Sequence, residues 1–174
     1  VTYNSKTKKM VSYKDIEVVI SGDKVIDIGK KLGEADSFID CKKKLVTPGF
    51  VDCHTHPVFL DNREDEFHMR ASGGLSYQEI SKMGGGISNS IAGVKNASEN
   101  ILISRVKSRM DKFLMLGTTT VECKSGYGLE TETELKSLRV IEEVNKIHEI
   151  DMIPTFMGAH DFPNEFINDK DSYV

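Results

Sequence analysis

The chain has 174 residues, which is enough for one ordinary domain and too few for two large ones. Its 23 basic and 27 acidic residues give a formal net charge of -4 without a long basic block, which disfavours a nucleic-acid partner. No apolar run approaches the roughly 20 residues of a membrane span, and the profile of a signal peptide is absent, so we expect a cytoplasmic protein without a membrane partner. The chain opens with Val1 rather than Met, so we expect residues to be missing upstream.

Residues 1–46 alternate short β-prone pieces with turns, which predicts a small antiparallel sheet. Residues 16–20 and 25–28 flank a turn and indicate a β-hairpin. Further strand pieces are expected at residues 37–40 and 45–46. This region carries no chemical motif, so we assign it a structural role.

An apolar run at residues 46–51 ends in Asp52 and the sequence His54-Thr55-His56. On a β-strand, Asp52, His54 and His56 would project from one face, because successive side chains alternate. Two neutral imidazoles at this spacing can bind one divalent metal, and a carboxylate behind them can orient a ligand ring. A His-x-His sequence also occurs by chance on solvated surfaces. The apolar run opens with a Pro-Gly turn, as a buried strand would, and therefore favours a metal site at the strand's C-terminal end.

The charged run of residues 62–70 predicts a loop that leads into a short helix. Arg63 lies just beyond the histidine pair and could bind a carboxylate in a bidentate manner, although an arginine in such a run is more often a solvated surface residue. The glycines at 84–86 lack the Gly-Lys-Ser/Thr ending of a P-loop and the spacing of a dinucleotide motif. We interpret them as a flexible turn near a site.

The second half of the chain alternates helical and strand patterns. Ser98 as an N-cap, apolar residues at helical spacing, and Gly117 after the last turn predict a helix over residues 99–116. The β-branched residues 118–124 predict a strand. The turn that follows would present Tyr127 at the C-terminal end of this strand.

Glu122 and Lys124 share one face of that strand, where an interior ion pair is more common than a catalytic couple. A capping box at residues 131–134 predicts the start of a second long helix. A third strand is expected over residues 152–159, and it ends at His160.

This alternation of strands and helices predicts parallel βαβ units. The polar side chains of interest all follow strand ends, namely His54, His56, Tyr127 and His160. Because parallel strands end at one edge of a sheet, we expect these side chains on one rim. Three strands cannot close a barrel, since an eight-stranded one needs about 250 residues.

The residues from Pro48 to His56 resemble the first barrel strand of the amidohydrolase superfamily. Further motifs follow in order along the chain: Arg63-Glu64-Asp65-Glu66-Phe67, Gly84-Gly85-Gly86-Ile87, Lys124-Ser125-Gly126-Tyr127-Gly128-Leu129 and Gly158-Ala159-His160. With them, the chain resembles the imidazolonepropionase family of that superfamily, most strongly from Thr47 to Pro163. The resemblance implies an α/β fold. Residues 47–174 would form a partial TIM barrel, its first three βα units, and residues 1–46 would be part of a small β-sandwich domain.

Carried over to this chain, the resemblance implies that His54 and His56 are ligands of a zinc or iron ion. Arg63 would bind the propanoate carboxylate of the substrate. Tyr127 and His160 would contact the substrate ring and orient or polarise it, with His160 as the catalytic residue. The implied reaction is hydrolysis of 4-imidazolone-5-propanoate to N-formimidoyl-L-glutamate in L-histidine degradation, by a nucleophile generated from water at the metal. The parent enzyme is expected to be a homodimer that binds only this small molecule.

The family supplies a third histidine ligand, an aspartate ligand and an acidic general base from later barrel strands, and none of these follows His160 here. We therefore expect an N-terminal piece that is inactive as an isolated chain. One alternative is another cyclic amidohydrolase or deaminase, such as a dihydroorotase or a guanine-deaminase relative. Another is a non-catalytic amidohydrolase-like assembly subunit, against which the histidine pair, Arg63 and Tyr127 count.

Overall fold

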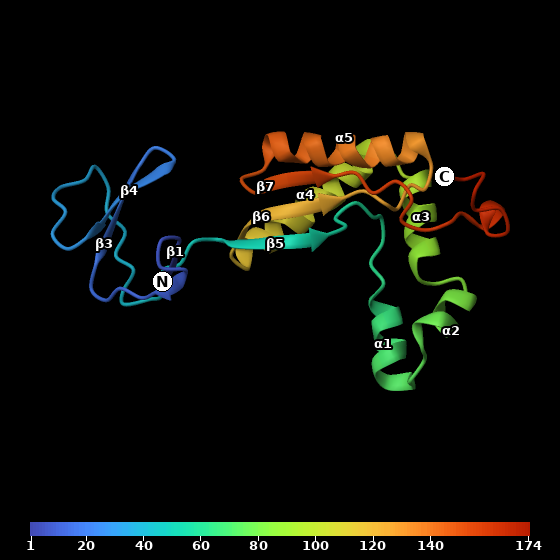
Figure 1. The fold of residues 1–174 in the computed structure, drawn as a ribbon, viewed down its shortest axis with the longest axis horizontal. Helices are drawn as coiled ribbons and strands as arrows, with labels where there is room; N and C mark the ends of the chain where they lie inside the picture. The colour runs from blue at the N-terminus through green and yellow to red at the C-terminus, as the bar shows by residue number, and fades with distance from the viewer. The chain divides into compact units, whose positions relative to one another are not determined.

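A computed structural model describes the backbone of residues 1–174 and the side chains of residues 1–163 and 165–174. The chain divides into two units, Val1–Pro48 and Gly49–Val174, each treated by itself below (Figure 1). Within this described part, no helix is both long and apolar enough to span a bilayer.

The first unit contains two separate β-hairpins rather than one sheet. The strands β1 (Thr2–Asn4) and β2 (Lys9–Val11) pair antiparallel, as do β3 (Glu17–Ser21) and β4 (Lys24–Gly29). The second pair confirms the predicted hairpin, and its turn contains Gly22 at a φ of +61°, a conformation that glycine adopts without strain.

The prediction of strands at residues 37–40 and 45–46 is wrong. The structure describes both segments, and both lie in loops. Their apolar side chains are largely exposed, with Phe38 at 80% and Ile39 at 85%. A strand needs a neighbouring strand for its backbone hydrogen bonds, and among the described residues β3 and β4 pair only with each other, so neither segment has a partner strand. Local β propensity alone did not create a third strand here.

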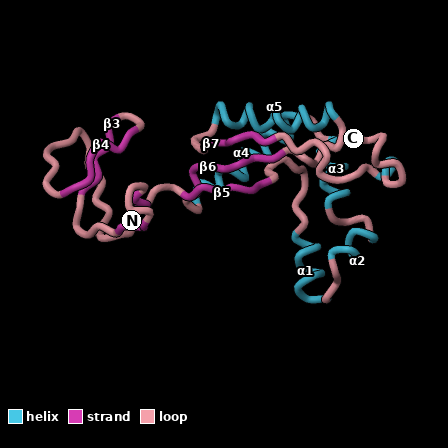
Figure 2. The backbone as a smooth tube through the Cα atoms, in the orientation of Figure 1, coloured by secondary structure: helices cyan, strands magenta, loops and turns pink.

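The second unit is built on an open parallel sheet of three strands. These are β5 (Phe50–Thr55), β6 (Thr118–Lys124) and β7 (Asp151–Thr155), in the order β5-β6-β7 (Figure 2). This confirms the predicted parallel βαβ pattern. Within the described residues the sheet does not close into a barrel.

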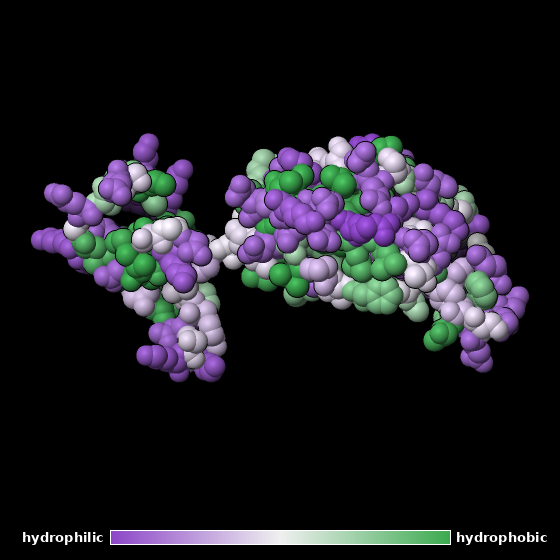
Figure 3. Space-filling view, turned by 90° about the horizontal axis from the view of Figure 1, so that it is seen from above, coloured by the Kyte–Doolittle hydropathy of each residue, from purple (hydrophilic) through white to green (hydrophobic). Residues whose placement is uncertain are grey.

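The helices α4 (Glu99–Met115) and α5 (Thr131–Ile147) connect these strands and pack on one face of the sheet. The side chains of the resulting core are contributed by both helices and by the strands: Leu102, Val106, Met110, Val121, Cys123, Val140, Ile141, Val144 and Met152. The outward face of α5 is hydrophilic (Figure 3). On β6, burial alternates, so Val121 and Cys123 face the helices while Glu122 and Lys124 face the other side of the sheet.

The caps of α4 confirm the prediction from its sequence. The Ser98 hydroxyl accepts a hydrogen bond from the backbone N–H of Ile101, and Gly117 follows the helix at a φ of +94°. The strand β7 is shorter than predicted and ends at Thr155, because its last ladder partner is Lys124, the final residue of β6. Residues 157–160 therefore belong to the loop after the strand.

Three helices between β5 and α4 have no counterpart in the prediction beyond the short helix expected after Arg63. They are α1 (Glu64–Gly73), α2 (Tyr77–Lys82) and α3 (Ile87–Asn96), and a single 3₁₀ turn, η1 (Asn164–Phe166), follows β7. Figure 1 shows α1 and α2 extending away from the sheet. A capping box formed by Ser76 and Glu79 starts α2, so a signal for this helix was present in the sequence.

Candidate metal and substrate site

Four side chains from three strand ends meet at the C-terminal edge of the parallel sheet. His54 and His56 come from the end of β5, Tyr127 from the loop after β6, and His160 from the loop after β7. The ring of His56 lies at the centre. Its centroid is 5.7 Å from that of His54, 5.0 Å from that of Tyr127 and 4.8 Å from that of His160, and the last two rings are stacked on it.

A backbone carbonyl fixes the orientation of the His56 ring. Nδ1 of His56 lies 2.8 Å from the carbonyl oxygen of Ser125. Because a carbonyl only accepts, Nδ1 carries the proton and the neutral ring keeps its lone pair on Nε2. Burial lowers the pKa of His56 below 6.5, against the opposing effect of the Ser125 hydrogen bond, and the neighbouring His160 and His54 lower it further. The neutral imidazole favoured in this way is the form that binds metals.

Asp52 does not take the orienting role expected for it. The pairing of β5 with β6 contains an irregularity between Asp52 and Thr55, so the simple alternation of faces is interrupted there. The Asp52 carboxylate accepts a hydrogen bond of 3.2 Å from the backbone N–H of His54, and the Thr55 hydroxyl donates to the carbonyl of Glu122. The group that orients His56 is therefore the carbonyl of Ser125.

The loop of residues 125–129 presents Tyr127 and is held by the two elements beside it. The backbone N–H of Ser125 donates to the Thr155 carbonyl at 3.0 Å, and the Ser125 hydroxyl accepts from Met157 N–H at 2.9 Å. Gly126 has a φ of +110°, and a Cβ built on it would lie 3.1 Å from the Cβ of His160. A glycine at this position thus permits both the turn and the close approach of His160.

Glu134 holds the same loop from the α5 side. Its side chain is only 1% exposed, and its carboxylate accepts hydrogen bonds from three backbone N–H groups of the loop. The predicted capping box is therefore wrong. The N-cap of α5 is Glu130, and Glu134 reaches the loop because three convergent N–H groups satisfy a buried carboxylate better than one helix-end group can.

Arg63 and Tyr127 line a cavity of about 260 Å³ beside the histidines. Its other lining residues are Phe59, Asp61, Asn62 and Ser90. One guanidinium nitrogen of Arg63, Nη1, is buried without a hydrogen-bond partner among the described residues, and it lies 3.7 Å from a carboxylate oxygen of Glu66. Burial raises the pKa of Tyr127, although the positive charge of Arg63 opposes the shift. Near neutral pH, the cavity therefore presents a protonated phenol and a guanidinium whose Nη1 has a long contact with Glu66 and no hydrogen bond within the described residues.

Arg109 on α4 is a positioning residue that the sequence reasoning missed. Its guanidinium donates hydrogen bonds to the carbonyls of Pro57, Phe59 and Leu60, at 3.1, 2.7 and 3.4 Å, and lies 3.4 Å above the Phe59 ring. Burial lowers the pKa of Arg109 to about 10, so it stays charged at neutral pH. A signal existed, since residue 109 follows Val106 by three positions on the apolar side of its helix.

The interior ion pair predicted on β6 is confirmed. The Lys124 ammonium contacts one carboxylate oxygen of Glu122, and both side chains are mostly buried. The second oxygen of Glu122 is also buried and has no partner in the described part of the chain. The pair lies on the sheet face that α4 and α5 leave uncovered.

The donor atoms at the edge of the sheet fit part of a metal site. His54 and His56 are imidazoles of the kind that bind zinc or iron, and the hydrogen bond to Ser125 leaves Nε2 of His56 available. Among the described residues, however, no group of three or more His, Cys, Asp or Glu side chains gathers in a metal-binding arrangement. The described residues thus supply two imidazole donors at this edge of the sheet.

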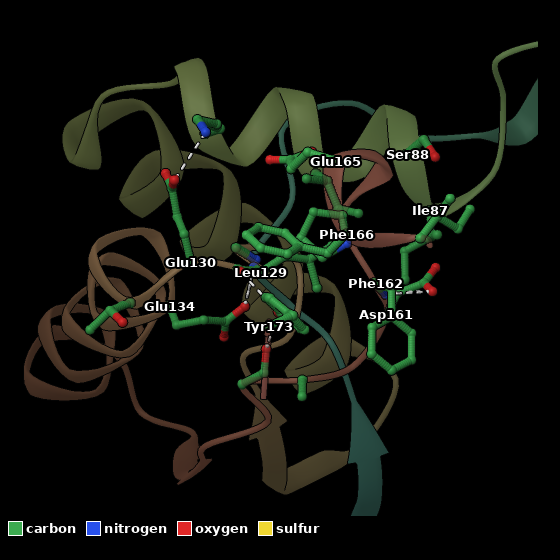
Figure 4. Close-up of a pocket in the computed structure, with 18 of the residues that line it drawn as sticks. Ile87, Ser88, Leu129, Glu130, Glu134, Asp161, Phe162, Glu165, Phe166 and Tyr173 are labelled. Carbon is green, nitrogen blue, oxygen red and sulfur yellow. Dashed lines mark hydrogen bonds and ion pairs between the residues drawn. The ribbon is translucent and has the colours of Figure 1, made fainter. Parts of the chain in front are cut away.

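The second unit also contains a larger hollow of about 1000 Å³ (Figure 4). It is lined by residues of α2, α3, the loop before α5, the start of α5 and the segment after β7, including Leu129, Glu130 and Tyr173. The Tyr173 hydroxyl donates to the carbonyl of Leu129 at 2.8 Å. The four site rings lie outside its lining, so this hollow and the histidine site are distinct.

No protein-family model matches the chain. Its sequence is 44% identical to an imidazolonepropionase of Alkaliphilus metalliredigens over 164 residues, which cover 90% of this chain and 39% of that protein. It is 48% identical to the Clostridium tetani imidazolonepropionase, in a match that covers 85% of this chain and 35% of that protein. It is 41% identical to the imidazolonepropionase of Haloarcula marismortui, in a match that covers 96% of this chain and 41% of that protein. The chain thus spans 35–41% of the length of these curated relatives. By sequence, it belongs with the imidazolonepropionases.

Proposed function

We propose that this chain is part of a metal-dependent hydrolase that opens 4-imidazolone-5-propanoate to N-formimidoyl-L-glutamate in histidine degradation. The observation that carries the proposal is the meeting of His54, His56, Tyr127 and His160 at one edge of a parallel sheet. The relatives named imidazolonepropionase narrow the chemistry from metal sites in general to this reaction.

The proposal extends to the fold. The second unit would be the first three βα units of a TIM barrel, and the first unit would be part of a small β-sandwich domain. One feature of the second unit supports this. Its helices α4 and α5 cover one face of the parallel sheet, as the outer ring of helices does in a barrel, and the uncovered face that bears Glu122 and Lys124 would then be the barrel interior. The chain would then be an N-terminal portion of its enzyme.

In the proposed mechanism, His54 and His56 hold a zinc or iron ion. The ion, when bound, makes water a competent nucleophile near neutral pH. Arg63 binds the propanoate carboxylate through two parallel N–H donors, a role supported by its place in the cavity lining and by the lack of a hydrogen bond at its Nη1 among the described residues. This contact fixes the substrate ring between the Tyr127 side and the histidines.

Tyr127 and His160 act on the ring itself. Tyr127 keeps its proton near neutral pH, because even the ordinary tyrosine pKa of 10.0 is well above that range and burial raises the pKa of Tyr127 further, so its hydroxyl can donate a hydrogen bond to the ring. His160 is the catalytic residue, which orients the ring and polarises its carbonyl as the C–N bond is hydrolysed. Its stacking on His56 is consistent with this role, because it brings the imidazole next to a metal ligand.

The test uses the full-length protein purified with its native metal. We expect consumption of 4-imidazolone-5-propanoate, followed by ultraviolet absorbance, with N-formimidoyl-L-glutamate identified by mass spectrometry. Dihydroorotate and guanine serve as control substrates and should remain unchanged. Turnover of a control substrate without turnover of the imidazolone would overturn the proposal. A homodimer and a cytoplasmic location stay predictions.

A further inference from the structure

The peptide group between Ser125 and Gly126 lies between a proposed metal ligand and a buried carboxylate. Its carbonyl oxygen is 2.8 Å from Nδ1 of His56, and its N–H donates to Oε2 of Glu134 at 2.7 Å. Both bonds belong to one planar unit, in which the C=O and N–H dipoles are aligned. His56 is therefore connected to the Glu134 carboxylate through a single peptide.

This connection has an electrostatic consequence. A carboxylate that accepts the N–H of a peptide draws positive charge to that end and leaves more negative charge on the carbonyl oxygen. The Ser125 carbonyl becomes a better acceptor for the Nδ1 proton of His56. Metal-binding histidines commonly donate their second N–H directly to a carboxylate or to a carbonyl. Here His56 donates to the Ser125 carbonyl, and the N–H of the same peptide group donates to the Glu134 carboxylate.

The Glu134 side chain is held rigidly enough for this task. Its other oxygen, Oε1, accepts from the N–H groups of Gly128 at 2.6 Å and Leu129 at 2.9 Å, so the carboxylate cannot rotate without losing all three bonds. Its 1% exposure removes competition from water. Figure 4 shows Glu134 extending from α5 toward the loop that contains Leu129.

We propose that Glu134 is a positioning residue that fixes the tautomer and orientation of His56 through the Ser125–Gly126 peptide. The metal-binding consequence rests on the proposed function, but the tautomer does not. In the metal-free protein, His56 is expected to carry its proton on Nδ1 and to present the lone pair of Nε2. Loss of the Glu134 carboxylate weakens this preference.

The first measurement is the nitrogen-15 spectrum of the histidine rings in the full-length, metal-free protein, at alkaline pH where imidazoles are neutral. Wild-type His56 should show a protonated Nδ1 and an unprotonated Nε2. In Glu134→Gln, one end of the side chain becomes an NH₂ group and faces an N–H donor, so the set of three bonds cannot persist. The Nε2–H tautomer of His56 should then become populated, and the Zn²⁺ dissociation constant should rise about 10-fold.

Ser137→Ala is the matched control. Ser137 lies on the same helix, is 1% exposed, and its hydroxyl donates to the Thr133 carbonyl at 3.0 Å rather than to the loop. It should leave the tautomer and the Zn²⁺ affinity unchanged. A wild-type His56 protonated on Nε2, or a Glu134→Gln tautomer identical to that of Ser137→Ala, would overturn the proposal.

A further measurement needs no variant and keeps the proposal testable if Glu134→Gln does not fold. The Gly126 amide of the wild type should exchange slowly with solvent because it is bonded to a buried carboxylate. Exchange as fast as that of an exposed loop amide would contradict the proposal. Both readouts are taken without substrate, so their failure is distinct from failure to hydrolyse imidazolone-propanoate.

Discussion

The two sides of the candidate site are held in different ways. On the side of the histidines, the loop of residues 125–129 is bonded to Thr155 of β7 and to the buried Glu134, and β7 and α5 pack on the main core. On the side of Arg63, every residue of α1 is exposed or half-buried, and the guanidinium lies 3.7 Å from its carboxylate neighbour Glu66. The first side is preorganised, while the second can adjust when a substrate binds. Substitutions on the histidine side should therefore reduce metal binding or stability, whereas substitutions on the Arg63 side should mainly weaken substrate binding.

The largest effect is expected on the preorganised side from His56→Ala in the full-length protein. It removes a proposed metal ligand and the ring on which Tyr127 and His160 stack. Metal content should fall to the background of a metal-free control, and hydrolysis to the uncatalysed rate. His68→Ala, which changes an exposed histidine of α1, should change neither quantity. Full metal content in His56→Ala would refute its role as a ligand.

Glu134→Ala should be the next most damaging change, and its effect should appear in stability. It leaves three backbone N–H groups of the loop without their buried acceptor. We expect the free energy of unfolding to fall by about 3 kcal/mol or more, measured by urea denaturation. Ser137→Ala should cost about 1 kcal/mol. Equal losses in the two variants would mean that Glu134 does not hold the loop as the structure indicates.

Arg63→Ala should produce a smaller effect that is confined to substrate binding. Hydrogen bonds to charged groups contribute about 1.5–3 kcal/mol, so KM should rise about 10- to 100-fold while metal content and the free energy of unfolding stay unchanged. Arg70→Ala, at an exposed arginine near the end of the same helix, provides the comparison. A drop in stability with an unaltered KM would assign Arg63 to structure instead.

The smallest effect concerns the ionisation of Tyr127. Burial raises its pKa above the ordinary value of 10.0, so the folded state retains this proton after an exposed tyrosine has lost its own. Since the unfolded chain binds fewer protons in that range, the contribution of Tyr127 to stability is full below pH 10 and declines as the pH rises through the folded pKa. The difference between the phenolate absorbance titrations of wild type and Tyr127→Phe should show this late ionisation. A difference centred at or below pH 10 would contradict it.

Sequence patterns were sufficient to predict elements that depend on interactions between residues close together in the chain. The hairpin of β3 and β4, the caps of α4 and the bounds of β6 follow from turn residues, Ser98 and β-branched residues that act on their immediate neighbours. The convergence of strand-end side chains followed from the parallel pattern alone. The helix α1 has no buried apolar stripe, so periodicity could not define it.

The misassigned residues depend on contacts distant in sequence. Glu134 looked like a capping residue because Thr131 precedes it by three positions, but its partners are N–H groups of the preceding loop. The acceptor that orients His56 is a backbone carbonyl 69 residues away, and a carbonyl has no signature in the sequence. Asp52 was expected to orient a histidine ring because regular strand pairing would place it on the same face as His54 and His56. The irregular pairing of β5 after Asp52 interrupts that alternation.

The Arg109 guanidinium also determines where motion near the site can begin. By binding the carbonyls of Pro57, Phe59 and Leu60, it attaches the segment directly after His56 to α4. We expect any displacement of α1, which follows this segment, to pivot at about residue 61, beyond the attachment. His54 and His56 lie on the other side of this attachment, so such a displacement is expected to leave the geometry of the proposed ligand pair unchanged.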